Sequence, residues 1–341
     1  MRPTVKDVAA LALVSPKTVS NVLGGTVPVA PDTRSRVEAA IERLGYVPNL
    51  AARGLRSGRT GIVALVMPDL RAPFSAEVSQ HFVELAHRRG LAVQIEQSWD
   101  DLDRTRELMA QARRHLVDGV VMNPTTVEQR DVVLTGGGGS VPLVMLGEVL
   151  QDDVDQVWVD SVDAAARMTR FLLGLGHRRI AMLGVPGPDV DTATGAQRRE
   201  GYRAALVEAG LPVDPALEVA CRTWRPDGGF AAMVDLLERG ERPDAVFCAT
   251  DSIAIGALSA LWTRGLHAPD DVSVAGFDDI DEAAFASPPL TTVRFDKRAY
   301  AEAALEHLVS RIEGSALPPT RIEVPVEIVE RASTRRIAPP R

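Results

Sequence analysis

The sequence predicts an α/β protein in which a small N-terminal helical unit precedes a much larger core built on parallel sheets. Three observations support this prediction. The 341 residues exceed one ordinary domain, at roughly 150 residues per domain. The first sixty residues have helical periodicity, and the rest alternates short apolar runs with amphipathic stretches. Hydrophobic residues make up 45% and charged residues 25%, which argues against a disordered or fibrous chain.

Nothing in the sequence indicates a membrane segment or a metal site. The longest apolar run, from Gly61 to Pro68, is far shorter than the roughly 20 residues of a membrane-spanning helix. The first residues lack the pattern of a signal peptide, so we expect a cytoplasmic protein with no membrane partner. Cys221 and Cys248 are too few for a disulfide framework, and no spacing of Cys or His suggests zinc. We therefore expect two buried thiols, no metal and no cofactor.

The charge is distributed unevenly along the chain. The first sixty residues hold nine Lys or Arg against four Asp or Glu, a net charge of +5, in a chain whose total is −8. The remaining residues therefore carry −13. A basic unit attached to an acidic body predicts that polyanion binding is confined to the N-terminal segment.

The N-terminal segment has the helix signals of a helix-turn-helix unit. Thr4 followed by Asp7 resembles a capping box, and the helix that it begins runs to about Leu11 or Ala12. Ser15 is a cap for a second helix over about Pro16 to Leu23, because proline suits the first helical position. A third apolar stripe, from Arg34 to Leu44, closes a three-helix core.

These residues carry a resemblance: the segment from Thr4 to Arg59 is similar to the DNA-binding headpiece and hinge of the lactose repressor (LacI/GalR) family. The resemblance places the headpiece at residues 1–46 and the hinge at 47–60. Two departures are Leu13, where the family commonly has Gly, and Ala30, where a capping Ser is usual. The matching motifs are Thr4-Val5-Lys6-Asp7-Val8-Ala9, Val14-Ser15 with Thr18-Val19-Ser20, Gly45-Tyr46-Val47-Pro48-Asn49, and Ala52-Arg53 with Leu55-Arg56-Ser57-Gly58-Arg59-Thr60.

The resemblance implies that the second helix lies in the major groove of a palindromic, double-stranded operator. Pro16, Lys17 and Asn21 then face base edges, where Lys17 suits guanine and Asn21 suits adenine. Hydroxyl and Arg groups fix the register on the DNA backbone. The other positions that the resemblance assigns to DNA binding are Thr4, Ser15, Thr18, Ser20, Asn49, Ala52, Arg53, Leu55 and Arg56.

The hinge segment contains an apolar residue, Leu55, between Arg53 and Arg56. A helix this short is marginal by itself, and Gly54 costs it about 1 kcal/mol. By resemblance, the hinge folds on the operator and pairs with its dimer mate in the minor groove, where Leu55 opens a base step.

From residue 61 onward, the alternation of strands and helices predicts parallel sheets with helices on both faces. The length allows two doubly wound subdomains, and the continuing resemblance implies the periplasmic-binding-protein-like core of the same family at residues 61–331. We expect an N-subdomain at about 61–160 and 293–319, a C-subdomain at about 161–292 and 320–331, and a tail at 332–341. The expected strands are Ile62–Met67, Ala92–Ile95, Gly119–Met122, Leu143–Leu146, Val157–Val159, Ile180–Leu183, Val246–Cys248, Val272–Ala275 and Ile322–Val329.

Ligands of such sheets bind beyond the carboxyl ends of the strands. The positions that match effector contacts in the family are Phe74, Arg198, Trp224, Thr250 and Asp278, with Asp160 as a further candidate. Arg198 and Asp278 suit hydroxyl or carboxylate groups, and Trp224 and Phe74 suit the face of a sugar ring. The resemblance thus implies a small-molecule effector, and these residues point to a carbohydrate.

Other function classes fit less well. The sequence has no G-x-G-x-x-G, Walker A, G-x-S-x-G or H-E-x-x-H motif, so we expect no catalytic residue and no enzyme. We interpret Gly136 to Gly139 as a loop and His177 as a hydrogen-bonding residue. A solute-binding protein of transport shares the core but needs a signal peptide and no headpiece. Only about a dozen residues follow Val329, without leucine heptads, so we expect a homodimer. The family resemblance implies that this dimer acts as a repressor.

Overall fold

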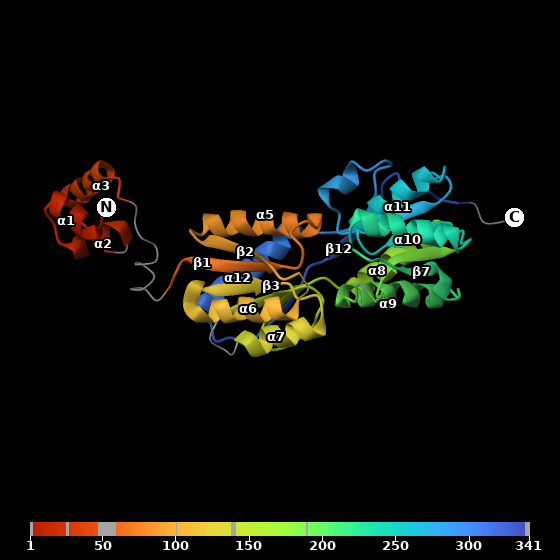
Figure 1. Cartoon of the computed structure of the whole chain (residues 1–341), viewed down its shortest axis with the longest axis horizontal. Coiled ribbons are helices and arrows are strands. Elements are labelled where there is room, and N and C mark those ends of the chain that lie inside the picture. Colours follow the sequence, from red (N-terminus) through yellow and green to blue (C-terminus); the bar gives the residue numbers. More distant parts are fainter. Residues whose placement is uncertain are drawn as a thin grey trace. The chain divides into compact units, whose positions relative to one another are not determined.

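The computed structural model describes residues 3–24, 27–46, 59–99, 101–137, 141–188 and 190–337. The chain divides into two compact units, and the boundary along the sequence lies between Gly61 and Ile62. Figure 1 labels their helices and strands. The first unit is the helical headpiece and the second is the α/β core, as predicted.

The headpiece consists of α1 (Val5–Ala12), α2 (Pro16–Gly24) and α3 (Pro31–Leu44). The predicted capping box is present: the Thr4 hydroxyl accepts from the Asp7 N–H at 3.4 Å, and the Asp7 carboxylate accepts from the Thr4 N–H at 2.8 Å. At α2, the Ser15 hydroxyl accepts from the Thr18 N–H at 3.1 Å. Both helix starts therefore follow from their cap residues.

The headpiece has a small core of its own. The helices bury one another's apolar faces, as the predicted stripes require. Leu13, in the turn after α1, has a φ of +56° and an 82% exposed side chain, so this turn adopts a conformation that favours glycine. The buried core residues are Val8, Ala9, Ala12, Val19, Val22, Val37, Ala40 and Tyr46.

The first lobe of the core is a six-stranded parallel sheet in the order β11-β5-β4-β3-β1-β2. Helices α5 and α12 pack together on one face, and α6 and α7 on the other (Figure 1). Its elements are β1 (Ile62–Met67), α5 (Pro73–Arg88), β2 (Ala92–Gln97), α6 (Leu102–Gln111), the π-helical turn η1 (Ala112–Leu116), β3 (Gly119–Met122), α7 (Val127–Gly137), β4 (Leu143–Leu146), β5 (Asp155–Trp158), α12 (Lys297–Ile312) and β11 (Arg321–Glu323).

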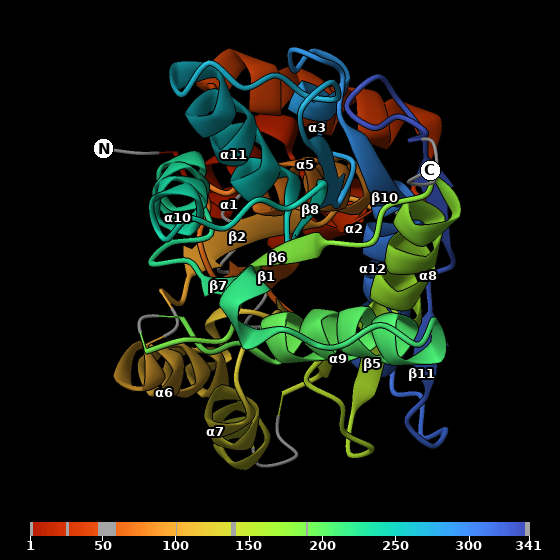
Figure 2. The same cartoon turned by 90° about the vertical axis from the view of Figure 1, so that its right-hand side faces the viewer.

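The second lobe has a six-stranded sheet in the order β12-β10-β9-β8-β6-β7, in which only β12 runs antiparallel to its neighbour within the described chain. Helices α8 and α9 cover one face, and α10 and α11 the other, as Figure 2 shows. The elements are α8 (Ser161–Gly174), β6 (Ile180–Val185), α9 (Ala193–Glu208), η2 (Pro215–Leu217), β7 (Glu218–Ala220), α10 (Pro226–Glu238), β8 (Ala245–Cys248), α11 (Asp251–Thr263), β9 (Ser273–Phe277), η3 (Asp281–Ala284), β10 (Thr291–Phe295) and β12 (Val326–Val329).

The chain passes between the lobes three times, and two of the passages differ from the expected positions. The expected subdomain bounds place the second passage near Val293, but it follows Phe295, because β10 pairs with β9 in the second sheet. The third passage, expected near Pro319, follows Glu323, because the single strand expected over Ile322–Val329 is two strands that belong to different sheets. Pro325 lies between them and cannot donate to a sheet ladder, so it ends one pairing before the other begins.

The segment after residue 331 is not a free tail as far as residue 337. Ser333 is fully buried, and its hydroxyl accepts from the Thr291 N–H at 2.8 Å and donates to the Val274 carbonyl at 2.6 Å. Farther on, the Arg335 carbonyl lies 3.1 Å from His177 Nε2, so His177 has the hydrogen-bonding role that we expect for it. Residues 333–337 therefore belong to the second lobe.

The run from Gly136 to Gly139, which we interpret as a loop from the sequence, begins inside a helix. Helix α7 continues to Gly137, so the first two glycines end a helix instead. Gly138 and Gly139 lie outside the described residues.

Candidate functional site

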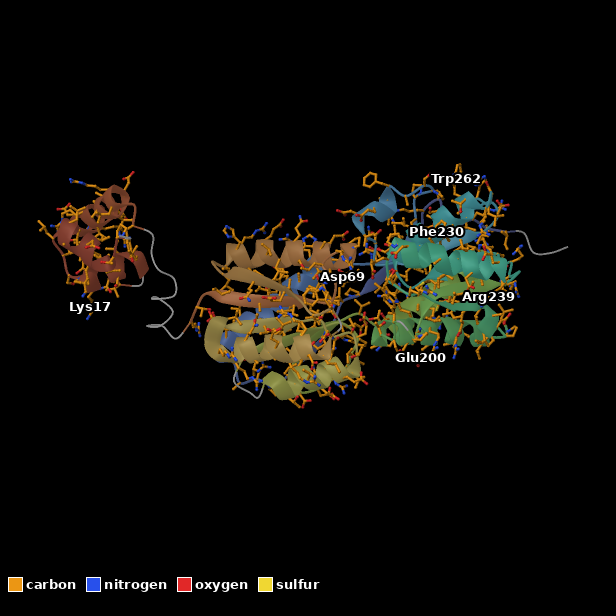
Figure 3. The ribbon with its side chains drawn as sticks, viewed as in Figure 1. Lys17, Asp69, Glu200, Phe230, Arg239 and Trp262 are labelled. Atoms are coloured by element: carbon orange, nitrogen blue, oxygen red, sulfur yellow. The ribbon has the colours of Figure 1, made fainter. Side chains whose placement is uncertain are left out.

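The candidate DNA-reading surface is the outer face of α2. Lys17 is exposed and points away from the headpiece (Figure 3). Asn21 follows four residues later, so both side chains lie on one face of the helix. Pro16 is exposed at the start of this helix. A cation and an amide thus occupy neighbouring turns of a helix whose opposite face is buried.

The headpiece hydroxyl groups that we expect to contact DNA also make hydrogen bonds within the headpiece. The Ser15 and Thr18 hydroxyls lie 2.9 Å apart, and the Ser20 hydroxyl donates to the Pro16 carbonyl at 3.0 Å. The Thr4 hydroxyl donates to the Asp7 carboxylate at 2.7 Å. These residues fix the starts and the packing of α1 and α2. Asn49, Ala52, Arg53, Leu55 and Arg56 lie outside the described residues.

A cleft of about 320 Å³ lies between the two lobes of the core. It is formed where the carboxyl ends of strands in both sheets face each other, the position in which open α/β sheets bind ligands. Five of the six residues expected to contact the effector line it: Phe74, Arg198, Trp224, Thr250 and Asp278. Asp69, which follows β1 and is labelled in Figure 3, lines the cleft from the first lobe.

Arg198 is the charged centre of the cleft. It comes from α9 and is only 3% exposed. Its guanidinium group donates to the Ala249 carbonyl, and it pairs with the Asp278 carboxylate at 3.4 Å. The guanidinium carbon also lies 3.4 Å from the ring centroid of Phe277. Arg198 is therefore held rigidly, as a group that presents donors to a ligand must be.

Asp278 follows β9 and completes the charged pair. Its backbone has a φ of +105°, and its N–H donates to the Val293 carbonyl at 2.9 Å. Burial raises the pKa of Asp278 to about 6, although the nearby cations Arg198 and Lys297 act in the opposite direction. The carboxyl group can therefore change its charge close to neutral pH.

Aromatic rings form the apolar part of the lining. Phe74, at the start of α5, lies 5.9 Å from Phe295 and 6.4 Å from Tyr300 between ring centroids. Trp224 lines the cleft from the loop after β7. Flat apolar surfaces beside charged hydrogen-bonding groups suit a ring that carries hydroxyl groups.

Thr250 lines the cleft and also caps a helix. Its hydroxyl accepts from the Ile253 N–H at 3.3 Å, at the start of α11.

Asp160, the sixth residue expected to contact the effector, is not among the residues that line the cleft. Its carboxylate accepts from the Asp163 N–H at 2.9 Å, so it caps α8 at the passage between the lobes. A contact of Asp160 with the effector stays a prediction.

Glu148 is a cleft residue that we did not predict. Its carboxylate accepts from the Thr194 hydroxyl at 2.8 Å and from the Ser161 hydroxyl at 3.2 Å, so a first-lobe residue is bonded to α9 and α8 of the second lobe. It follows β4, and the rule on carboxyl ends of strands could have found it. Tyr300, which also lines the cleft, comes from α12, and no strand pattern points to it.

The described residues include no cluster of His, Cys, Asp or Glu that could hold a metal ion. Within the same residues, no helix has the length and apolar character needed to cross a membrane.

Two parts of the chain match known families. Residues 4–49 match the family described as bacterial regulatory proteins, lacI family. Residues 169–334 match a periplasmic binding protein-like domain. The HTH-type transcriptional repressor PurR of Escherichia coli O1:K1 / APEC is 32% identical over 332 residues, which are 97% of this chain and 96% of the relative.

Solved structures of regulators resemble nearly the whole chain. The complex of the transcriptional regulator CelR with cellobiose has a TM-score of 0.73 and 34% identity, and the match covers 97% of this chain and all of that one. The lac repressor dimer bound to operator and the anti-inducer ONPF has a TM-score of 0.87 and 25% identity, over 98% of this chain and all of that one.

Proposed function

The chain belongs to the lacI family of bacterial regulatory proteins, and on that premise we propose that it is a transcriptional repressor whose affinity for a palindromic operator is controlled by a carbohydrate effector. It is a regulator, like its relatives, and not an enzyme. The proposal rests on a polar and aromatic cleft in the same chain as a helix, α2, whose outer face exposes Lys17. The cleft is lined by Arg198, Asp278, Phe74 and Trp224.

The headpiece supplies the DNA contacts. Lys17 and Asn21 read base edges in the major groove, and Pro16, Thr4, Ser15, Thr18 and Ser20 position α2 against the backbone. The hinge adds Asn49, Ala52, Arg53 and Arg56, and Leu55 opens a base step in the minor groove. Two copies of the chain bind as a homodimer, because a palindromic site presents two equivalent half-sites. Such a regulator acts in the cytoplasm, where the DNA is.

The cleft supplies the control. A ligand that contacts Arg198 and Asp278 from one lobe and Phe74 from the other binds best when both lobes surround it, so it favours one arrangement of the core. Ring stacking and charge-assisted hydrogen bonds are the interactions that sugars make. The 34% identity to a regulator solved with cellobiose supports a carbohydrate of this kind. A transport protein would not need the segment that matches the lacI family.

Selection from genomic DNA tests this function. Fragments retained by the protein are sequenced with and without cellobiose and a panel of other sugars. We expect enrichment of a palindromic sequence and a change in its retention with one of the sugars. A variant with both Lys17→Ala and Asn21→Ala is the control and should enrich no palindrome. Retention without sequence preference would refute the repressor, and a response to no sugar would refute the carbohydrate effector.

The hinge is tested separately with Leu55→Ala. This variant should lose affinity for the selected operator while its salt-dependent binding to random DNA stays nearly unchanged, since the wedge acts only on the bent, specific duplex. Competition binding at several salt concentrations measures both. Equal losses on operator and random DNA would contradict the assignment of Leu55.

A further inference from the structure

The loop that carries Asp278 to the cleft, from Asp278 to Asp281, has an unusual backbone. Asp278 has a φ of +105° and Asp279 a φ of +46°, both in a region that residues other than glycine rarely adopt. Such a conformation persists only where its surroundings hold it in place. The contacts that hold this loop therefore determine whether Asp278 faces the ligand.

The second lobe holds the loop from one side. The fully buried Asp251 carboxylate accepts from the Ile280 N–H at 2.9 Å and from the Thr292 hydroxyl at 2.6 Å. The Arg331 guanidinium group donates to the Asp279 carboxylate at 2.7 Å. These contacts lie within one lobe and move with the loop.

The first lobe holds the same loop through two charged side chains. Glu77 on α5 accepts from the Asp281 N–H at 2.9 Å, and its other oxygen pairs with Lys297 Nζ at 2.8 Å. Lys297, at the start of α12, also donates to the Asp279 carbonyl at 2.7 Å. The Lys297 side chain is 8% exposed and that of Glu77 18%, so water screens this pair little.

Neither side chain lines the effector cleft. Glu77 and Lys297 instead line a separate groove of about 600 Å³, which shares Phe295 with the cleft. Their influence on the effector is therefore indirect: both side chains bond to the backbone of the loop, and the Lys297 charge also acts on the Asp278 carboxylate. This arrangement links α5 and α12 of the first lobe to the carboxylate that the ligand meets.

We propose that Glu77, acting with Lys297, is a positioning residue that couples the effector-binding loop of the second lobe to the first lobe. The inference rests on the proposed function of the cleft. We call Glu77 and Lys297 together the clamp. When both side chains bond to the loop, the clamp is closed: the two lobes are joined, and the Asp278 carboxylate is oriented toward the ligand. A ligand that requires this setting favours the joined state, and the clamp carries the effect to α5.

Three variants of the full chain test the clamp. Glu77→Gln keeps an acceptor for the Asp281 N–H but loses the charge that Lys297 needs, and Glu77→Ala loses both. Glu84→Gln is the matched control, because Glu84 lies on the same helix and faces Arg298 of α12 at 3.8 Å, without contact to the loop. Each of the Gln variants removes one negative charge from a link between α5 and α12.

The first measurement needs no ligand. Hydrogen exchange of peptides that contain residues 278–281 should be fastest in Glu77→Ala, intermediate in Glu77→Gln and unchanged in Glu84→Gln. Exchange in the headpiece should not change in any variant. The same exchange in Glu77→Ala and the unmodified protein would overturn the clamp, and it would do so whether or not the cleft binds a sugar.

The second measurement uses cellobiose, or the sugar from the panel that most alters operator retention. Glu77→Gln should need about tenfold more sugar for half of the response, with operator affinity in its absence changed less than about twofold. Lys297→Met should have the same effect, and the double variant Glu77→Gln/Lys297→Met no larger one, because the two side chains act as one unit. Additive losses, or equal losses in Glu84→Gln, would overturn the proposal. A wild-type protein that responds to no sugar refutes the carbohydrate function alone. The hydrogen-exchange measurement then tests by itself whether Glu77 and Lys297 hold the loop.

Discussion

In the headpiece, the side chains that we expect to read bases lie between Pro16 and Asn21 on one helix, whereas the cleft draws its lining from residues between Pro68 and Tyr300. Pro16 and Lys17 are exposed and Asn21 is half-buried, and none of the three belongs to the small core behind α2. Arg198 and Asp278, by contrast, are buried and hold other parts of the second lobe. A change on α2 should therefore alter recognition alone, while a change in the cleft should alter both recognition and stability.

Arg198→Ala should have the largest effect and sharpens this contrast. Removing one partner of a buried charge pair leaves Asp278 without its guanidinium group, at a cost of about 3 to 5 kcal/mol to the core. Denaturant unfolding should show a weaker core, and effector binding should be lost. Arg239→Ala is the control, because Arg239 lies on the outer surface of the second lobe (Figure 3) and, among the described residues, pairs with Asp235 alone. Equal stability of the two variants would contradict the expectation that cleft residues, unlike those on α2, also stabilise the core.

Asn21→Ala should change recognition without changing stability. We expect a loss of preference of about 1 to 3 kcal/mol at one base pair of each half-site, because the amide can make a paired hydrogen bond to adenine. Selection of operator variants from a randomised library measures the preference, and thermal unfolding checks the headpiece. An unchanged consensus sequence would remove Asn21 from the set of base-reading residues.

The pH dependence of effector binding should come from Asp278. Burial raises its pKa to about 6, so the carboxylate that accepts hydrogen bonds from sugar hydroxyls is present above that pH and is lost as the pH falls through it. Sugar affinity should then be about tenfold lower at pH 5 than well above pH 6. Calorimetric titration across this range measures the effect. In Asp278→Asn the affinity should be weaker and independent of pH, and a persistent slope would assign the titration to another group.

Thr4→Ala should have the smallest effect and be confined to the headpiece. The variant loses the capping box of α1, which costs about 1 kcal/mol. Chemical shifts or hydrogen exchange of the headpiece should report the loss, while unfolding of the core stays the same. A change in the core transition would show that the two units do not unfold independently.

The same contrast explains what could be predicted from the sequence. The helix starts at Thr4 and Ser15 follow from local cap chemistry, and strands such as Ile62–Met67 follow from long apolar runs. Glu218–Ala220 has only three residues, too few for a periodic pattern. The split between β11 and β12 depends on which sheet each strand joins, a property of the assembled fold that no local pattern encodes.

The cleft shows the same limit. Five of its six expected residues line it, because positions after parallel strands converge. Asp160 also follows a strand, but it lies at the start of α8, where its carboxylate caps the helix. Tyr300 reaches the cleft from a helix whose place depends on the second passage between lobes. The sequence could identify cleft residues that follow strands. Cleft residues that come from other elements, such as Tyr300, depend on the path of the chain through both lobes.

The path of the chain also sets the order in which the protein can be completed during synthesis. The first sheet lacks its outer strand until Arg321–Glu323 has been made, although its other strands end at Trp158. The second lobe is completed later still, because the Ser333 hydroxyl bonds to both β9 and β10. A ribosome that has translated most of the core therefore carries two unfinished lobes with exposed apolar surface. Premature termination after residue 296 should thus yield two defective halves and not one intact lobe.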